Sequence, residues 1–300
     1  MMVGLEHNTT GRAAASPNGV RRRWRRLCAG VLKRLQPQRT LVIRFDDDLK
    51  IGVRAGERLG RAVYVDGYSD GAHARLLHRF LRPGMVYFDI GAHFGQFTLV
   101  AAGCVGSGGQ VHAFEAAGET FGQLKANIEL NHLTNVTANH AAVFDKPGRI
   151  ELQVCVPGKG EFNAIGKPLR PEREVIGTET VPAVTIDDYC REHRIERIDL
   201  MKIDTNGAEL SVLRGAEHLL AGDDAPAIVC EFNDVTVADM GYHTADLRAE
   251  LERQGYGLYR LDESTDRLAP EPQRDYPKTV DVIAAKDANR FDQLIHNGTS

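Results

Sequence analysis

The segment Met85–Phe97, MVYFDIGAHFGQF, constrains the fold more than any other part of the chain. Its first four residues are apolar and predict a short buried strand. Asp89, Gly91 and Gly95 follow, and the apolar pattern then becomes helical. A strand that turns through glycines into a helix N-terminus places backbone N–H groups at the carboxyl edge of a sheet. Open α/β sheets hold nucleotide-like ligands at this edge.

The spacing of this motif is Asp-x-Gly-x-x-x-Gly, which differs from the Gly-x-Gly-x-x-Gly pattern of dinucleotide-binding folds. Here Asp89 already ends the first strand, where a carboxylate would repel a pyrophosphate. It suits a ligand with a cationic end, such as the amino acid part of S-adenosylmethionine. A second acid, Glu115, ends the strand-like run Val111–Glu115 and is placed to accept hydrogen bonds from two ribose hydroxyls.

The composition allows one sizeable domain with additions, or at most two, in 300 residues of which 42% are hydrophobic. The five cysteines are scattered without a Cys-x-x-Cys pair, so neither a zinc site nor a disulfide framework is indicated. This cysteine usage favours a reducing, cytoplasmic setting. No apolar run approaches the ~20 residues of a membrane span.

The formal net charge of -4 is unevenly distributed. Residues 1–40 hold nine Lys or Arg and one acid, so the remainder carries about -12. An acidic body of this kind is a poor candidate for non-specific nucleic-acid binding, and we expect no nucleic-acid partner.

The N-terminal segment has two parts. Residues 1–19 are rich in small and polar types and are predicted to be disordered. Val20–Leu35 combines seven basic residues with an apolar stripe at helical spacing, formed by Val20, Trp24, Leu27, Val31 and Leu35. One interpretation is an interfacial helix that makes peripheral contact with anionic lipid or binds a partner. The other is an extension that packs on the domain or stays solvated.

Four regions are expected along the chain. They are a basic segment at 1–40, an extension at 41–82, a principal domain at 83–287 and a tail at 288–300. The extension should contain short antiparallel strands or a hairpin, with Ala62–Tyr68 among the strands, followed by a helix over Asp70–Leu81.

The principal domain alternates strands and helices, which requires a mainly parallel sheet with right-handed crossovers. The last two strand-like runs have no helix between them, so the final strand should be antiparallel. A third strand is expected near Asn135–Val143 and a long helix over Ala208–Leu220. Arg149–Val181 interrupts the alternation with a strand-like run, ELQVCV, then a Gly- and Pro-rich run, KGEFNAIGKPLRPE, then a further strand. It is expected to be an irregular insertion beside the carboxyl edge of the sheet, suited to a substrate lid.

Four acids end predicted strands: Asp89, Glu115, Asp204 and Glu231. Any one of them has an ordinary explanation, because strand-end carboxylates are often solvated or cap the next helix. Four at one sheet edge, around a glycine turn, favour a functional site.

At these positions the sequence resembles the FkbM family of S-adenosylmethionine-dependent methyltransferases. The resemblance covers roughly Leu41 to Ala285, and the stretches that carry it are DIGAHFGQF, VHAFEA, LKANIELNHL, TIDD, IDLMKIDTNGAELSVLRGAEHLL and IVCEF. It implies an α/β, Rossmann-like class I methyltransferase fold with a seven-stranded sheet and an antiparallel last strand. It also implies O-methylation of a hydroxyl on a sugar, glycan, lipid or polyketide-like acceptor.

Site residues follow from the strand ends and from this resemblance. Cofactor contacts are expected from Asp89, Gly91, His93, Gly95, Glu115, Ala141 and Asp204. Catalysis is expected from Asp204, Glu209 and Glu231, either with one carboxylate as base or with two holding a divalent cation such as Mg²⁺. Asn233 is a further candidate metal ligand.

Two positions depart from the family pattern. His93 stands where the family usually has Asn, and Asn206 stands where it usually has an acid. These departures keep a second interpretation open, a non-catalytic binding module with the methyltransferase fold. A third interpretation, a nicotinamide-dependent oxidoreductase, is disfavoured by the missing Gly-x-Gly-x-x-Gly pattern and by the early Asp89.

Overall fold

The structure is a computed structural model, and it describes residues 19–166, 174–262, 265 and 267–296. The expected disorder of residues 1–18 therefore falls outside the described residues. The centre of the molecule is an eight-stranded sheet with the strand order β13-β12-β14-β11-β10-β3-β4-β5. Its strands are β3 (Val86–Ile90), β4 (Gln110–Phe114), β5 (Val136–Asn139), β10 (Leu200–Ile203), β11 (Ala227–Phe232), β12 (Gly257–Asp262), β13 (Arg267–Pro270) and β14 (Val280–Ala285).

Strand directions confirm the expected Rossmann-like α/β class. The neighbours β11, β10, β3, β4 and β5 are parallel, and β14 runs antiparallel between β11 and β12. The sheet differs from the expected seven strands by one, because β13 pairs antiparallel with β12 at the edge.

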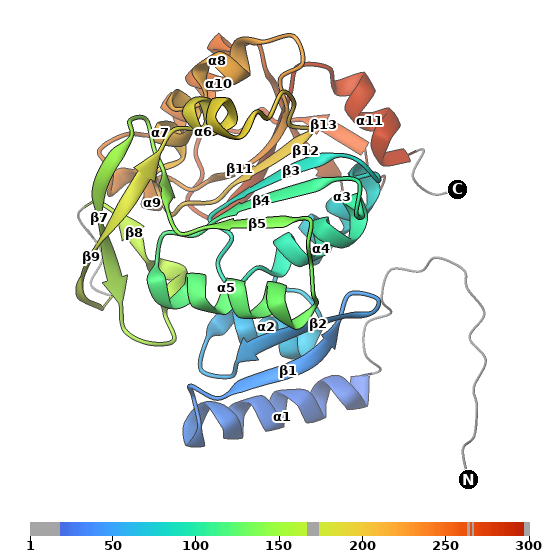
Figure 1. Cartoon of the computed structure of the whole chain (residues 1–300), viewed down its shortest axis with the longest axis vertical. Coiled ribbons are helices and arrows are strands. Elements are labelled where there is room, and N and C mark those ends of the chain that lie inside the picture. Colours follow the sequence, from blue (N-terminus) through green and yellow to red (C-terminus); the bar gives the residue numbers. More distant parts are fainter. Residues whose placement is uncertain (1–18, 167–173, 263–264, 266, 297–300) are drawn as a thin grey trace.

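Helices cover both faces of this sheet (Figure 1). One face packs against α3 (Gly71–Phe80), α4 (Gln96–Val105) and α11 (Ala288–His296). The other packs against α6 (Ile186–His193), α7 (Glu209–Arg214) and α10 (Thr244–Arg253). Strand β3 shows why the two faces separate: Phe88 and Ile90 enter one core and Tyr87 the other, since successive strand residues point to opposite sides. The helix α5 (Gly118–Leu130) packs along β5 with Leu124 and Ile128.

The N-terminal extension is partly as predicted. The strands β1 (Thr40–Phe45) and β2 (Leu49–Arg54) form the expected antiparallel hairpin. The strand expected over Ala62–Tyr68 is wrong, because most of this run lies in α2 (Arg58–Asp66), which buries Val63 and Val65. The hairpin shares a hydrophobic core with α4, so the division of the chain at residue 83 stays a prediction.

The insertion is more regular than expected. A four-stranded sheet in the order β6-β9-β7-β8 comprises β6 (Ala142–Val143), β7 (Gly148–Cys155), β8 (Ala164–Ile165) and β9 (Val175–Val184). A short 3₁₀ helix, η1 (Gly160–Phe162), lies between β7 and β8. The expected third strand is thereby split, because β5 belongs to the main sheet and β6 to this small one. Part of the Gly- and Pro-rich run, residues 167–173, lies outside the described residues.

One helical prediction is corrected, and the expected tail contains a helix. The helix expected over Ala208–Leu220 is divided into α7 and α8 (Glu217–Ala221). They are separated at Gly215, where a Cβ atom would lie 2.1 Å from the carbonyl oxygen of Phe144. The expected tail contains α11, whose Phe291 and Ile295 are buried in the core. The remaining short helix, α9 (Asp234–Ala238), follows β11.

The N-terminal helix α1 (Gly19–Leu35) confirms the helical pattern predicted from Val20 onward. It lies outside the β1–β2 hairpin in Figure 1. Within the described part of the chain, none of the helices combines the length and the hydrophobicity that spanning a membrane requires.

Candidate active site

A row of ionisable side chains crosses one face of the sheet near its carboxyl end. Lys202 lies beside Asp89 in the register of β10 and β3, and Asp204 follows two residues later. On the next strands Glu231 is opposite Asp281. Strand residues two apart, and residues directly opposite each other, point to the same side. All five side chains therefore face α3 and the N-terminal end of α4.

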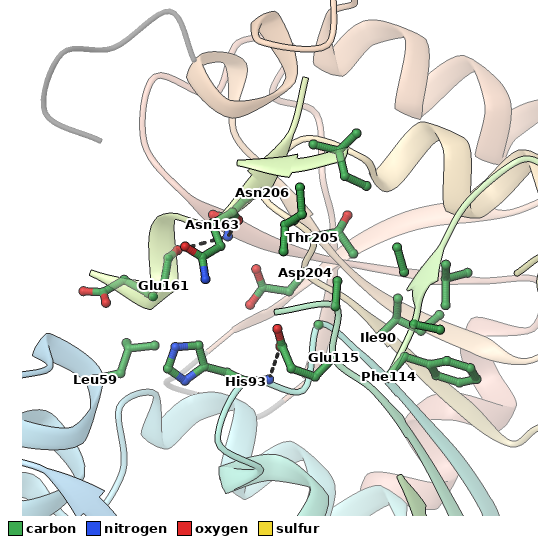
Figure 2. A pocket seen from close by; sticks show the side chains of 18 residues that line it. Leu59, Ile90, His93, Phe114, Glu115, Glu161, Asn163, Asp204, Thr205 and Asn206 are labelled. Atoms are coloured by element: carbon green, nitrogen blue, oxygen red, sulfur yellow. Dashed lines mark hydrogen bonds between the residues drawn. The ribbon is translucent and has the colours of Figure 1, made fainter. Parts of the chain in front are cut away.

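A first cavity opens at the carboxyl ends of β3, β4 and β10 (Figure 2). Its apolar wall comes from Ile90, Phe114, Ala141, Ala142, Val143, Leu152 and Ile165. Its polar wall comes from His93, Glu115, Glu161, Asn163, Asp204, Thr205 and Asn206. The insertion contributes part of both walls, which places it beside the site as expected.

Gly91 sets how closely the turn after β3 approaches the end of β10. Its backbone has φ +82°, and a Cβ atom would lie 1.8 Å from the carbonyl oxygen of Asp204. A side chain at this position would therefore separate the two strand ends. The N–H groups of Gly91 and Ala92 donate to Phe114 O at 3.0 and 2.9 Å, so neither is free for a ligand.

Glu115 lies in the first cavity and is held by backbone donors. Its Oε2 accepts from His93 N and its Oε1 from Ala117 N, both at 2.9 Å. Burial raises the pKa of Glu115 to about 7, against the lowering effect of these two hydrogen bonds. A carboxylate has about four lone-pair sites, so about two remain for hydroxyl groups of a ligand. This arrangement agrees with the expected role of Glu115.

His93 contributes a neutral imidazole to the first cavity. Burial lowers the pKa of His93 to about 4, and both ring nitrogens are buried without a hydrogen-bond partner in the described structure. In Figure 2 the ring lies beside Glu115 and Leu59. The residue has φ +52°, a left-handed conformation that Asn and His adopt more readily than most residues. The departure from Asn at this position is therefore compatible with the turn.

A second cavity of about 330 Å³ lies next to the first. The two share the wall residues Leu59, Gly91, His93, Glu161, Asp204 and Asn206. Beyond this shared wall the second cavity is mainly polar, with Arg58, Asp70, Gln96, Lys202, Glu231, Asn233, Thr279 and Asp281, and it includes the rings of Phe94, Phe97 and Phe162. Asp204 thus stands at the boundary between two adjoining spaces.

Lys202 neutralises part of the acidic row. Its Nζ lies 2.9 Å from Asp204 Oδ2, so this buried lysine is paired with a carboxylate. Burial alone would raise the pKa of Asp204, but Lys202 and a hydrogen bond with Glu231 lower it below its ordinary value. Burial alone would lower the pKa of Lys202, yet Asp204 and Asp89 raise it. Both groups therefore stay charged at neutral pH.

The surroundings of Glu231 raise its pKa, whereas those of Asp204 lower the pKa of Asp204. Its side chain is 8% exposed, and its Oε2 is buried without a hydrogen-bond partner among the described residues. Burial, and then the nearby carboxylates of Asp204, Glu209 and Asp281, raise the pKa of Glu231 well above its ordinary value. These effects favour the protonated form of Glu231 next to the ionised Asp204.

Glu209 does not reach either cavity. It is fully buried, and its Oε1 accepts from Thr205 N, Thr205 Oγ1 and Gly207 N at 2.9, 3.0 and 3.1 Å. Its Oε2 accepts from the Tyr242 hydroxyl at 3.3 Å. Glu209 therefore holds the loop after β10, and we correct its expected catalytic role to a structural one.

The expected metal site is not supported by the donor geometry. Asn233 caps α9, because its Oδ1 accepts from Val235 N at 3.0 Å while its Nδ2 donates to Thr279 Oγ1 at 2.8 Å. One oxygen of the Asp204 carboxylate is already paired with the Lys202 ammonium. Among the described His, Cys, Asp and Glu residues, no group of three or more is arranged to hold a metal ion.

Two further expected cofactor contacts lie below the cavity walls. Asp89 is 1% exposed, and its Oδ2 accepts from Thr98 Oγ1 at 2.6 Å in the first turn of α4. Gly95 has φ +88° and faces α5, where a Cβ atom would lie 2.6 Å from Leu124 Cδ1. Neither residue belongs to the described lining of the two cavities, so we assign both to the support of the turn.

Sequence reasoning missed two residues of the second cavity. Gln96 is 4% exposed; its Oε1 accepts from Ser69 N at 3.0 Å, and its Nε2 is buried without a partner in the described ranges. Burial and the carboxylates of Asp70 and Asp204 raise the pKa of Asp281 to about 7. Gln96 and Asp281 are polar residues within a mainly apolar helix and strand, a pattern that is visible in the sequence.

The chain was compared with known proteins. The methyltransferase FkbM domain family matches residues 89–258. The 31-O-demethyl-FK506 methyltransferase FkbM of Streptomyces tacrolimicus is 30% identical over 212 residues, covering 61% of this chain and 77% of that protein. Methyltransferase 1 of Beauveria bassiana (strain ARSEF 2860) is 26% identical over 159 residues, covering 48% and 64%. The solved structure of a methyltransferase FkbM from Methylobacillus flagellatus KT shares 16% identity, with a TM-score of 0.41, over 87% of this chain and 58% of that one.

Proposed function

Because this chain belongs to the FkbM family of S-adenosylmethionine-dependent methyltransferases, we propose that it methylates a hydroxyl group on a sugar, glycan, lipid or polyketide-like acceptor. Family membership also argues against the nicotinamide-dependent oxidoreductase interpretation. The proposal assigns the methyl donor to the first cavity and the acceptor to the second.

The residues of the first cavity fit the donor. Glu115 retains lone pairs for ribose hydroxyls, and Phe114, Ala141 and Val143 offer an apolar wall for a base. S-adenosylmethionine supplies, when bound, a methyl group attached to a positively charged sulfur. The ionised Asp204 places negative charge at the boundary of the two cavities, where it favours a cationic ligand.

The second cavity suits a hydroxylated acceptor. Asp70, Gln96, Glu231 and Thr279 offer donors and acceptors of hydrogen bonds, and Phe97 offers an aromatic surface. The unpartnered Nε2 of Gln96 and Oε2 of Glu231 would gain partners from such a molecule, since buried polar atoms are normally hydrogen-bonded.

Glu231 is the base in this proposal. The pair of Glu231 and Asp204 holds its proton on Glu231, because Lys202 stabilises the charge on Asp204 and burial opposes the charge on Glu231. After that proton is lost, Glu231 is a stronger base than an ordinary carboxylate and accepts the proton of the acceptor hydroxyl. Asp204 then orients the hydroxyl from the shared wall.

One observation carries this proposal: Glu231 is buried with one carboxyl oxygen, Oε2, unpartnered among the described residues, and it lines a cavity that shares the Asp204 wall with the cavity of Glu115. The relative from Streptomyces tacrolimicus supports the choice of a hydroxyl, because its name describes an enzyme that methylates 31-O-demethyl-FK506.

The test is a transfer assay with S-adenosylmethionine labelled in its methyl group and a panel of hydroxyl, amine and thiol acceptors. We expect label on hydroxyl oxygen alone, identified by mass spectrometry of the product. Transfer only to nitrogen or sulfur would contradict the proposal. Cofactor binding without transfer to any acceptor would favour the non-catalytic binding module instead.

A further inference from the structure

The helix α1 turns its apolar side away from the protein. Trp24, Leu27, Val31 and Leu35 are 65%, 60%, 55% and 75% exposed. At 3.6 residues per turn these four positions form one stripe along the helix. The stripe therefore faces solvent, which is the reverse of the usual packing of an amphipathic helix on a core.

The opposite side of α1 attaches it to the domain. Arg22 pairs with Asp66, and Arg25 Nη1 donates to Tyr64 O at 3.1 Å. Ala29 is 3% exposed at the same contact with α2. These contacts fix the rotation of the helix about its axis, so the exposure of the stripe follows from how α1 is docked.

Positive charge borders the exposed stripe. Arg23, Arg26, Lys33 and Arg34 are exposed on one flank of the helix, and the segment Gly19–Leu35 contains no acidic residue. On a helical wheel, Arg23 and Arg34 lie directly next to the stripe. The side chains of Val20 and Arg21 lie outside the described residues. The surface thus combines apolar contact with a uniform positive charge.

We propose that α1 docks the enzyme flat on an anionic lipid surface. The stripe, termed here the Trp24–Leu35 stripe, enters the boundary between headgroups and acyl chains, and the flanking basic side chains contact lipid phosphates. Tryptophan favours this boundary because it is both apolar and a hydrogen-bond donor. A linear apolar stripe with charge of one sign matches a flat anionic layer better than a protein surface of mixed charge. The inference is independent of the acceptor.

Trp24 is the single tryptophan of the chain and reports directly on the contact. The full chain is titrated with phosphatidylcholine vesicles that contain about 30 mol% phosphatidylserine, and with vesicles of phosphatidylcholine alone. We expect a blue shift of Trp24 emission and co-flotation with the anionic vesicles, and much weaker binding to the neutral ones. Raising NaCl to about 0.5 M should weaken binding, because the Debye length shortens.

Two variant pairs separate the apolar and electrostatic contributions. The double variant Leu27→Ser/Val31→Ser keeps Trp24 and should bind at least about tenfold more weakly, because two large apolar side chains no longer enter the layer. The double variant Arg23→Gln/Arg34→Gln should bind about 25-fold more weakly, at about fivefold for each charge. Ile176→Ser, which removes an exposed apolar side chain on β9, is the matched control and should bind like the wild type.

All four positions of the double variants are exposed, so the variants should fold, and their melting temperatures should match the wild type. Absence of vesicle binding by the wild type would overturn the proposal. Equal binding by Leu27→Ser/Val31→Ser would also overturn it. If the chain dimerises and that double variant abolishes the dimer without any vesicle binding, the stripe is a self-association surface and the lipid proposal fails.

Discussion

Glu231 combines access to the second cavity with a pKa well above its ordinary value. Asp204 lines the same cavity, but the ammonium group of Lys202 makes it a weaker base. In the proposed mechanism the two carboxyl groups therefore have different roles: Glu231 exchanges the proton, and Asp204 keeps its charge.

Glu231→Gln should fold and bind the methyl donor, yet its turnover should fall by about 10²–10⁴-fold, because an amide accepts no proton. In the wild type, kcat should rise with pH over a range above the ordinary titration of a glutamate, since the raised pKa of Glu231 keeps the base protonated at lower pH. The measurement is the pH profile of kcat for both proteins, and the variant should lose this rise. An unchanged profile in the variant would show that Glu231 is not the base.

Asn206 is the second departure from the family pattern, and its hydrogen bonds explain why an amide suits this position. Its Nδ2 donates to Glu161 O at 3.0 Å and to Asn163 O at 3.2 Å, which joins the loop after β10 to the insertion. An acid at this position cannot donate and would place negative charge beside two carbonyl oxygens. The amide thus suits the way this chain closes the first cavity.

Asn206→Asp should lower the free energy of unfolding by about 1–3 kcal/mol and weaken donor binding, because two carbonyl groups are left without their donor. Urea unfolding and calorimetry measure the two effects. Asn206→Gly is the matched control, since it keeps the left-handed backbone at φ +55° and removes the donor without adding charge. We expect it to be milder. Wild-type behaviour of Asn206→Asp would contradict the role of this contact.

At the residue scale, the sequence predicts where the strand-end acids lie in the fold better than it predicts what each acid does. Strand-end acids can be recognised from the apolar runs before them, and Glu115, Asp204 and Glu231 do reach the cavities. The hydrogen-bond partners of an acid depend on chain segments far away in the sequence. The contact between Glu209 and Tyr242 is of this kind, and it removes Glu209 from the candidates.

At the element scale, the turn after β3 is the part of the fold on which the site depends most. Gly91 and Gly84 both have left-handed backbones, with φ +82° and +88°. A Cβ atom at Gly91 would collide with Asp204 O, whereas at Gly84 the described structure has no atom within 4 Å of it. Comparing a substitution at Gly84 with the same substitution at Gly91 therefore separates the cost of a strained backbone from the cost of a steric collision.

Gly84→Ala should cost about 1–2 kcal/mol of stability, the usual penalty of a left-handed alanine. Gly91→Ala should cost a further 1–3 kcal/mol, roughly that of an overpacked contact, and should weaken donor binding because β3 and β10 are forced apart. Urea unfolding of both variants gives the comparison. Equal losses in the two variants would show that the close approach at Gly91 is not important.

Helices and strands with a clear hydrophobic period in the sequence could be predicted. Those whose limits depend on tertiary contacts could not. The strands β3, β4, β10, β11 and β14 follow from apolar runs between turn residues. The α7–α8 break could not be predicted, because it depends on Gly215 approaching Phe144 O. The two strand-like runs of the insertion could be recognised, but their pairing in a small sheet could not, since β7 pairs with β9 across a Gly- and Pro-rich loop, between residues that run from Gly148 with Ala183 to Cys155 with Val175.

At the scale of the whole molecule, α1 is an addition to a fold that is complete without it. Deleting residues 1–35 should leave a folded protein, because α1 is attached to α2 mainly by surface interactions, each worth about 0–1 kcal/mol. Circular dichroism and donor binding should match the full chain. A truncated protein that fails to fold would show that α1 belongs to the core.

We propose that the donor occupies the cavity of Glu115 and the acceptor the cavity of Glu231. The most direct measurement is calorimetric titration of S-adenosylmethionine into the wild type, Glu115→Ala and Glu231→Gln at pH 8. We expect Glu115→Ala to weaken binding by roughly ten- to a hundredfold, since a hydrogen bond to a charged group contributes about 1.5–3 kcal/mol. We expect Glu231→Gln to bind like the wild type. Normal binding by Glu115→Ala, or lost binding by Glu231→Gln, would contradict the assignment of the two cavities.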